Sequence, residues 1–216
     1  MSEPKLYDIT LPGGKVARVR EPTPHDVLDV GFMADRRILD RTVKMLDGKP
    51  RRVGDPLALG QRDYLALWEV VRHTWIQPHP ELEDVCETQI EPGPEPGQLW
   101  IPLPSGIVKR DDEPVATLFV LLQETDAGTY NEHMQSVNGP TAEARASQVD
   151  AAGLRMTKLA VKAERRDGVV KTLSALDLAA WPYGLPDLWV LRLAWVQMVT
   201  PREEDVATSM GSVRLV

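Results

Sequence analysis

The residue types that could carry enzymatic chemistry are few and scattered along this 216-residue sequence. Its histidines are His25, His73, His79 and His133, and no two of them are four residues apart, as paired metal ligands on one helix face would be. His79 and Cys86 lie on either side of an acidic stretch, in a spacing that zinc sites do not use. We therefore predict no metal site.

Motifs for nucleophiles and for phosphate binding are also missing. There is no Gly-x-Ser-x-Gly string, and Gly13-Gly14-Lys15 lacks the upstream glycine and the following hydroxyl of a P-loop, so it indicates a turn. Acidic neighbours of Cys86 disfavour the thiolate that a nucleophile needs. Carboxylate runs, such as residues 81–87 and 203–205, are typical of solvated faces. We predict no catalytic residue, no cofactor and no enzymatic activity.

Composition and charge limit the classes of partner. The net charge is −7 and the sequence pI is about 5.2, and the basic residues occur in short pairs with acids nearby, so nucleic acid is a poor candidate partner. The 43% hydrophobic content is ordinary for a globular chain, and the single cysteine fits a reducing compartment. With no signal peptide and no membrane span in the sequence, we expect a soluble protein made in a cytoplasm.

Two tryptophan-bearing stretches organise the chain, Asp63–Gln77 and Leu185–Gln197. Each follows an Asp-Gly pair and a polar loop. A shift of 120 residues places Asp47-Gly48 on Asp167-Gly168 and Trp75 on Trp195 without a gap. The pattern predicts a duplicated unit in which each copy ends in an apolar helix.

The first unit, residues 1–80, is predicted to begin with a β-hairpin over Leu6–Arg20 around Pro12-Gly13-Gly14. Thr23 is a candidate N-cap for helix over Pro24–Leu46, either as one helix or as two with a break near Gly31. Gly48 is the expected C-terminal cap of this helix. The first tryptophan helix then ends before Pro78 and Pro80.

Residues 81–97 are acidic and proline-rich and predict an extended linker, with a surface loop inside one domain as the alternative. The second unit, residues 98–216, repeats the opening with a predicted hairpin over Leu99–Arg110. Periodicity leaves Val115–Gln123 open between strand and helix. Further helices are predicted over Ala142–Arg165, from Ser174 or Asp177, and from Pro186, and the final residues, SVRLV, form an edge strand or an arm.

The fold class that follows is α+β and mainly helical, with two related units that each consist of a β-hairpin and a bundle of two to four helices. The second tryptophan helix is apolar nearly all round, so it is either central in the core or covered by a partner. Large apolar side chains dominate the energetics of many protein interfaces. The residues that we predict to bind a partner are Trp189, Leu193, Trp195 and Val196 of this helix, together with Trp100.

Short strings in the first unit carry a family resemblance. They are Leu11-Pro12-Gly13-Gly14, Arg18-Val19-Arg20-Glu21-Pro22-Thr23 with Asp26, and Gly60-Gln61-Arg62-Asp63-Tyr64-Leu65. In this order they resemble tail assembly and baseplate proteins of bacteriophages, namely the Mu-like tail assembly chaperones and the T-even-type baseplate hub assembly proteins. The resemblance covers about the first eighty residues, and the second unit, which lacks the Arg-Glu-Pro-Thr string, matches in outline.

The resemblance implies a non-enzymatic protein that binds hub, tube or tape-measure proteins within a hetero-oligomeric assembly. It would be present in the host cytoplasm during assembly and then in the virion tail. Because such chaperones are often single units, the duplication favours a permanent baseplate or hub-associated adaptor. A transient tail assembly chaperone, absent from the mature virion, and a bacterial adaptor or regulatory protein unrelated to phage are the alternatives.

Overall fold

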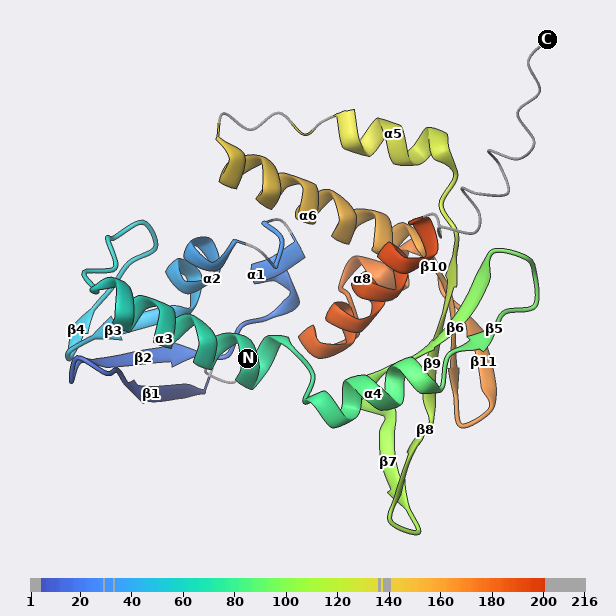
Figure 1. The fold of residues 1–216 in the computed structure, drawn as a ribbon, viewed down its shortest axis with the longest axis horizontal. Helices are drawn as coiled ribbons and strands as arrows, with labels where there is room; N and C mark the ends of the chain where they lie inside the picture. The colour runs from blue at the N-terminus through green and yellow to red at the C-terminus, as the bar shows by residue number, and fades with distance from the viewer. Residues whose placement is uncertain (1–4, 29, 33, 136, 138–140, 201–216) are drawn as a thin grey trace, which may run out of the picture.

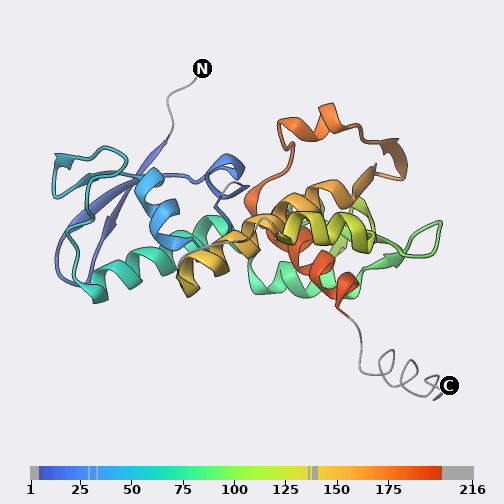
Figure 2. The ribbon, with the colours of Figure 1, turned by 90° about the horizontal axis from the view of Figure 1, so that it is seen from above.

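The computed structural model describes residues 5–28, 30–32, 34–135, 137 and 141–200. Two antiparallel sheets lie toward opposite ends of an elongated body, and the long helices run between them (Figure 1). The view from above shows α6 (Ala142–Ala160) crossing the middle of the body (Figure 2). The fold class is therefore mixed α+β, with more residues in helices than in strands.

The first sheet has the order β1-β2-β3-β4. Its predicted hairpin is confirmed as β1 (Leu6–Thr10) and β2 (Val16–Arg20), which pair in antiparallel register. The turn between them uses Gly14 at a φ of 83°, a conformation that glycine adopts without steric penalty. The Leu11 N–H donates to the Lys15 carbonyl and closes this turn.

Of the two alternatives for Pro24–Leu46, the structure has two helices with a break near Gly31, and the second helix stops earlier than expected. These helices are α1 (Pro24–Leu28) and α2 (Asp35–Thr42), and residues 43–46 form β3 (Val43–Leu46) beside β2. Pairing with β2 overrides the helical period of these residues. The prediction that Gly48 caps the helix was wrong, since Asp47 and Gly48 both have positive φ and form the hairpin turn to β4 (Lys49–Pro50).

The first tryptophan helix is confirmed as α3 (Gln61–Val71), which continues into the π-helical η1 (Arg72–Ile76). The extended linker expected at residues 81–97 is not what forms there. Instead, α4 (Pro80–Thr88) is followed by the short strand β5 (Glu91–Pro92). Proline in the first turn and acidic residues near a helix N-terminus both favour this helix, and burial of Val85 and Cys86 holds it against the body.

The second sheet has the order β11-β10-β9-β6-β5. The hairpin predicted over Leu99–Arg110 was wrong, because β6 (Gln98–Pro102) pairs with β9 (Leu118–Gln123), whereas β7 (Ile107–Arg110) pairs with β8 (Glu113–Ala116). The short 3-10 turn η2 (Pro104–Gly106) separates β6 from β7. The ambiguous stretch Val115–Gln123 is therefore mostly strand, and five of the six β9 residues are buried.

After α5 (Ala127–Gln135), the long helix α6 ends at Ala160 and not at Arg165 as predicted. Val161 and Ala163 are both buried on β10 (Val161–Arg166), which pairs with β9 and with β11 (Val169–Thr172), and a register shift between them places them in different hydrophobic clusters. The short helix α7 (Ala175–Ala179) is capped by Ser174, and the second tryptophan helix is α8 (Leu185–Val199), as predicted. The SVRLV stretch lies outside the described residues.

One hydrophobic core connects the parts that belong to the two sheets. The hydroxyl of Ser147 on α6 donates to the Val30 carbonyl after α1 at 2.6 Å, and the Trp189 ring on α8 meets the Phe32 ring edge-on at 5.0 Å. The strands β6, β9, β10 and β11 are neighbours in the same order as β1 to β4. In both sheets the last pair of strands is joined by an Asp-Gly turn.

Candidate interaction surface

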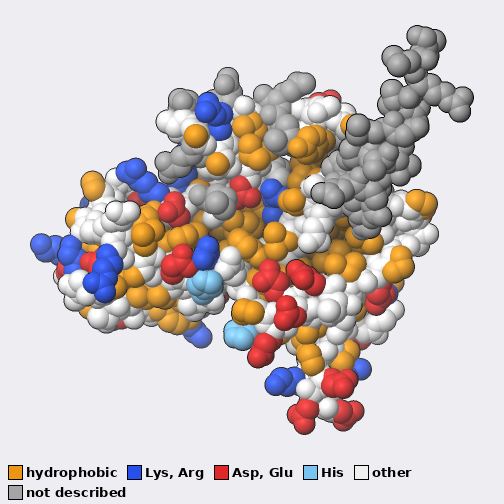
Figure 3. All heavy atoms as spheres, viewed as in Figure 1, with side chains coloured by type: hydrophobic (Ala, Val, Ile, Leu, Met, Phe, Trp, Pro, Cys, Tyr) orange, Lys and Arg blue, Asp and Glu red, His pale blue; other side chains and the backbone are white. Residues whose placement is uncertain are grey.

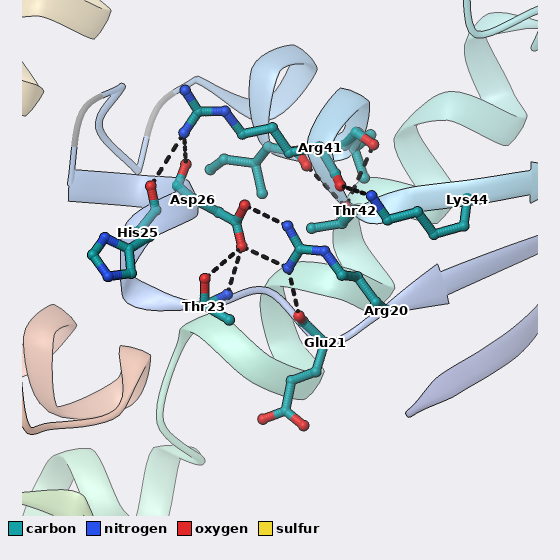
Figure 4. A network of polar contacts seen from close by, with 10 residues as sticks. Arg20, Glu21, Thr23, His25, Asp26, Arg41, Thr42 and Lys44 are labelled. Atoms are coloured by element: carbon teal, nitrogen blue, oxygen red, sulfur yellow. Dashed lines mark hydrogen bonds and ion pairs between the residues drawn. The ribbon is translucent and has the colours of Figure 1, made fainter. Parts of the chain in front are cut away.

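Three of the residues in the resembling strings, Arg20, Thr23 and Asp26, form a polar network at the start of α1 (Figure 4). The Arg20 guanidinium donates to both oxygens of the buried Asp26 carboxylate, at 2.6 and 2.7 Å. Thr23 donates its backbone N–H and its hydroxyl to the same carboxylate, each at 2.8 Å. Thr23 therefore acts here as a donor to Asp26, so it does not cap the helix with its side-chain oxygen as predicted. The Arg41 guanidinium donates to two α1 carbonyls.

This network has a structural role in the fold. Burial alone would raise the pKa of Asp26, but hydrogen bonds from Arg20 and Thr23 outweigh it and lower the pKa, so the carboxylate stays charged beside its cation. The strand β2 and the helix α1 are thereby joined at a fixed angle. The Arg-Glu-Pro-Thr string with Asp26 thus specifies a strand-to-helix corner, in which the side chains of Arg20, Thr23 and Asp26 are bound to one another.

A second polar arrangement occurs twice. Gly13 in the β1–β2 turn donates its N–H at 2.7 Å to Asp63, which is in the first turn of α3. Ser105 in η2 donates its N–H at 2.9 Å to Asp187, which is in the first turn of α8. Both aspartates are buried, and both helices begin after a glycine N-cap. We call these two contacts the aspartate clamps, because each ties a tryptophan helix to a Leu-Pro-x-Gly turn.

The electrostatics of Asp187 are dominated by its burial, with 1% of its surface exposed. This burial raises the pKa of the carboxyl, although hydrogen bonds from Ser105 and Gly184 act in the opposite direction. The Gly184 N–H is the second backbone donor to this carboxyl, at 3.1 Å. These clamps were not identified from the sequence, although the repeated Leu-Pro-x-Gly strings and the acid near each helix start were available as signals.

The residues predicted to bind a partner are separated by the fold. Trp195 is buried and donates its indole N–H to the Thr125 hydroxyl at 3.0 Å. Trp100 is buried on the second sheet beneath the Arg165 guanidinium, which lies 5.0 Å from the ring centroid. Trp189 is half-buried against the first unit's Phe32, as described above. Leu193, by contrast, has 38% of its surface exposed, and Val196 is half-buried.

Leu193 lies on a groove between α4 and α8, which we call the acidic groove. α8 contributes four residues at positions i, i+3, i+4 and i+7, namely Val190, Leu193, Ala194 and Gln197. α4 contributes Glu83, Cys86 and Glu87, and Ile90, just after the end of α4, and Ile101 of β6 complete the lining. Acidic side chains gather over α4 beside an apolar area in the space-filling view (Figure 3). The α4 side of the groove was missed from the sequence because residues 81–97 were interpreted as an extended linker.

The chemistry available at this groove is recognition and not nucleophilic attack. Burial, reinforced by Asp187, Glu83 and Glu87, raises the pKa of the Cys86 thiol to about 12, so the thiolate is scarce at neutral pH. The described part of the chain contains no cluster of three or more potential metal ligands. A larger hollow of about 550 Å³ lies beside α2 and the start of α6, but its three arginines and three aspartates balance in charge.

Comparisons with known proteins identify no relative. No family model matches the chain, and no curated protein and no solved structure is significantly similar to it. Among the described helices, none combines the length and the apolar character that crossing a bilayer requires.

Proposed function

We propose that this protein is a non-enzymatic structural or assembly protein of a bacteriophage tail, a baseplate or hub-associated adaptor that binds other tail proteins. The proposal rests on the resemblance carried by residues 11–26 and 60–65. The partners are hub, tube or tape-measure proteins within a hetero-oligomeric assembly. The protein would meet them in the host cytoplasm and remain with them in the virion tail.

The observation that carries the adaptor role is the repeated aspartate clamp, with Asp63 on one turn and Asp187 on the other. Together with the matching strand order of the two sheets, it supports two related units, each with a sheet, a clamped turn and a tryptophan helix. We infer that residues 1–80 form the first unit and residues 98–216 the second, with residues 81–97 between them. A body with two similarly built ends suits a protein that bridges two neighbouring subunits.

The shared core supports a rigid bridge. Because α6 packs on the chain after α1 through Ser147 and Val30, the two ends would keep a fixed separation when partners bind. Pre-organisation of this kind lowers the entropy lost on association. An adaptor that stays in the particle needs this rigidity more than a chaperone that binds one unfolded segment.

Mass spectrometry of purified particles tests the proposal. Particles produced by the genome that encodes this chain should contain the full-length protein in a fixed ratio to the tail proteins, and disruption of the gene should give particles with defective tails. Detection with tail proteins in lysates, but not in particles, would assign the chain to the transient chaperones. Absence from both would overturn a role in the tail.

A further inference from the structure

The acidic groove is a shallow depression of about 20 Å³ between α4 and α8. Its α8 wall spans two helical turns, which is a length of about 10 Å, and its α4 wall continues past the end of the helix to Ile90. Its floor includes the side chains of Cys86 and Ile101, both at most 1% exposed, and Leu193 projects from the α8 wall. Apolar side chains at such positions accept the hydrophobic face of an amphipathic segment.

The described side chains that line the groove carry a net negative charge, and no basic side chain among them balances it. Glu83 and Glu87 lie on the α4 wall, and none of the described lining residues is Lys or Arg. Glu81 and Asp84 add further negative charge on the exposed side of the same helix, and α4 contains no basic residue. Within the described chain, no ion pair involves a carboxylate of α4.

We propose that the acidic groove binds a short amphipathic segment of a tail protein, in which Lys or Arg side chains flank apolar ones. This inference rests on the proposed function for the identity of the partner, and on charge complementarity for its chemistry. The apolar side chains of the segment pack over this shallow depression, next to the exposed Leu193. Its basic side chains pair with Glu83 and Glu87.

The chain's own last residues are a poorer occupant. Residues 201–216 contain two arginines against three acidic residues, so their net negative charge is repelled by the α4 wall. A basic segment gains from the same field, and this gain falls as salt screens it. Salt dependence therefore distinguishes the proposed mode of binding from a purely apolar contact.

A fluorescent peptide serves as the probe, tested against the full-length protein. It is a 14-residue helix-forming sequence with Leu at positions i, i+3, i+4 and i+7 and Lys on both flanks, and its twin carries Glu in place of Lys. Fluorescence anisotropy at about 0.15 M salt, where the Debye length is about 8 Å, should show binding of the Lys peptide at least about tenfold tighter than binding of the Glu peptide. Equal binding of the two peptides overturns the charge assignment.

The double variant Glu83→Lys/Glu87→Lys should weaken binding of the Lys peptide by about tenfold or more. Its matched control, Glu81→Lys/Asp84→Lys, makes the same change in net charge on the same helix outside the groove, and should weaken binding less than about threefold. Circular dichroism verifies that α4 folds in both. Equal effects of the two pairs would assign the binding to overall charge and overturn the groove as the site.

A second pair of variants tests the apolar part without altering charge. Leu193→Gln should weaken binding several-fold, whereas Leu65→Gln on α3, at a position that is 48% exposed and outside the groove, should leave it unchanged.

Incorporation into particles then separates the proposed groove from the proposed tail function. If Glu83→Lys/Glu87→Lys enters particles as well as the wild type does, the groove is wrong but the tail role stands. If the wild type itself is never found with tail proteins, the proposed function fails whatever the peptide does.

Discussion

Removal of the second aspartate clamp should destabilise the whole body. In Asp187→Ala, the N–H groups of Ser105 and Gly184 lose a carboxylate acceptor at 2.9 and 3.1 Å. Hydrogen bonds to a charged group contribute about 1.5–3 kcal/mol each, so the two together correspond to about 3–6 kcal/mol. Relief of the desolvation of this carboxyl offsets part of the loss, and we expect a net decrease of about 2–4 kcal/mol in the free energy of unfolding.

Asp187→Asn should be milder than Asp187→Ala, since the amide oxygen still accepts from Ser105 while no charge is buried. The pH dependence of stability also distinguishes the wild type from Asp187→Asn. Because burial raises the pKa of Asp187 in the folded state, the wild type binds a proton that the unfolded chain has already released above a pH of about 3.9. This contribution is fully present below that pH and is lost as pH rises through the folded pKa. Stability of the wild type relative to Asp187→Asn should therefore decrease with rising pH in this window.

Urea unfolding followed by tryptophan fluorescence measures these changes in the free energy of unfolding. In thermal unfolding of a chain of this size, a change of 1 kcal/mol corresponds to a shift of about 2–4 °C in Tm. Asp63→Ala is the comparison in the first unit. Its carboxylate accepts one backbone N–H, from Gly13, so we expect a smaller loss of about 1–2 kcal/mol. The reasoning would be refuted if Asp187→Ala unfolded within 0.5 kcal/mol of the wild type, or if Asn were as damaging as Ala at position 187.

Three further predictions concern other parts of the molecule. Trp195→Ala should lower the free energy of urea unfolding by about 3–5 kcal/mol because the ring is buried, whereas Leu193→Ala should change it by less than about 1 kcal/mol; equal effects would contradict the assigned burial. Cys86, with a pKa of about 12 and a buried thiol, should react with a disulfide reagent at pH 8 in urea and not in the native state. The lowered pKa of Asp26 contributes stability above a pH of about 3.9 that is lost as pH falls through the folded pKa, so a pH series should show the difference between wild type and Asp26→Asn shrinking in acid.

The sequence predicted correctly those elements that are determined by turn and cap residues a few positions apart. Pro12-Gly13-Gly14 identified the first hairpin, and Ser174, one of the two predicted starts of the short helix, is the N-cap of α7. The apolar run of α8 was also recognised, and of the two roles expected for it, the structure places most of the helix in the core. The outward-facing part, around Leu193, is smaller than the sequence suggested because Trp195 points inward.

Three of the errors share one physical cause, which is pairing with another strand. Residues 43–46 and 161–166 both follow a helix and continue its apolar period, yet both form strands because β2 and β9 offer unpaired backbone groups beside them. The hairpin expected over residues 99–110 was replaced for the same reason, since β9 is a longer and more buried partner for β6 than β7 is. The proline-rich composition of residues 81–97 concealed α4, whose prolines flank the helix or open its first turn.

The two aspartate clamps have a different spacing along the sequence from the two Asp-Gly turns. The Asp-Gly turns are 120 residues apart, and the sequence match extended this spacing through the tryptophan helices. The N-caps Gly60 and Gly184, and the clamp residues Asp63 and Asp187, are instead 124 residues apart. A slip of four residues is close to one helical turn and keeps the same face toward the core, so apolar periodicity cannot detect it. The hydrogen bonds of the clamps do detect this slip, because a carboxylate four residues farther along the helix would not reach the N–H of the Leu-Pro-x-Gly loop. When α3 and α8 are aligned on their clamp aspartates, Trp195 aligns with the buried Val71 and not with Trp75.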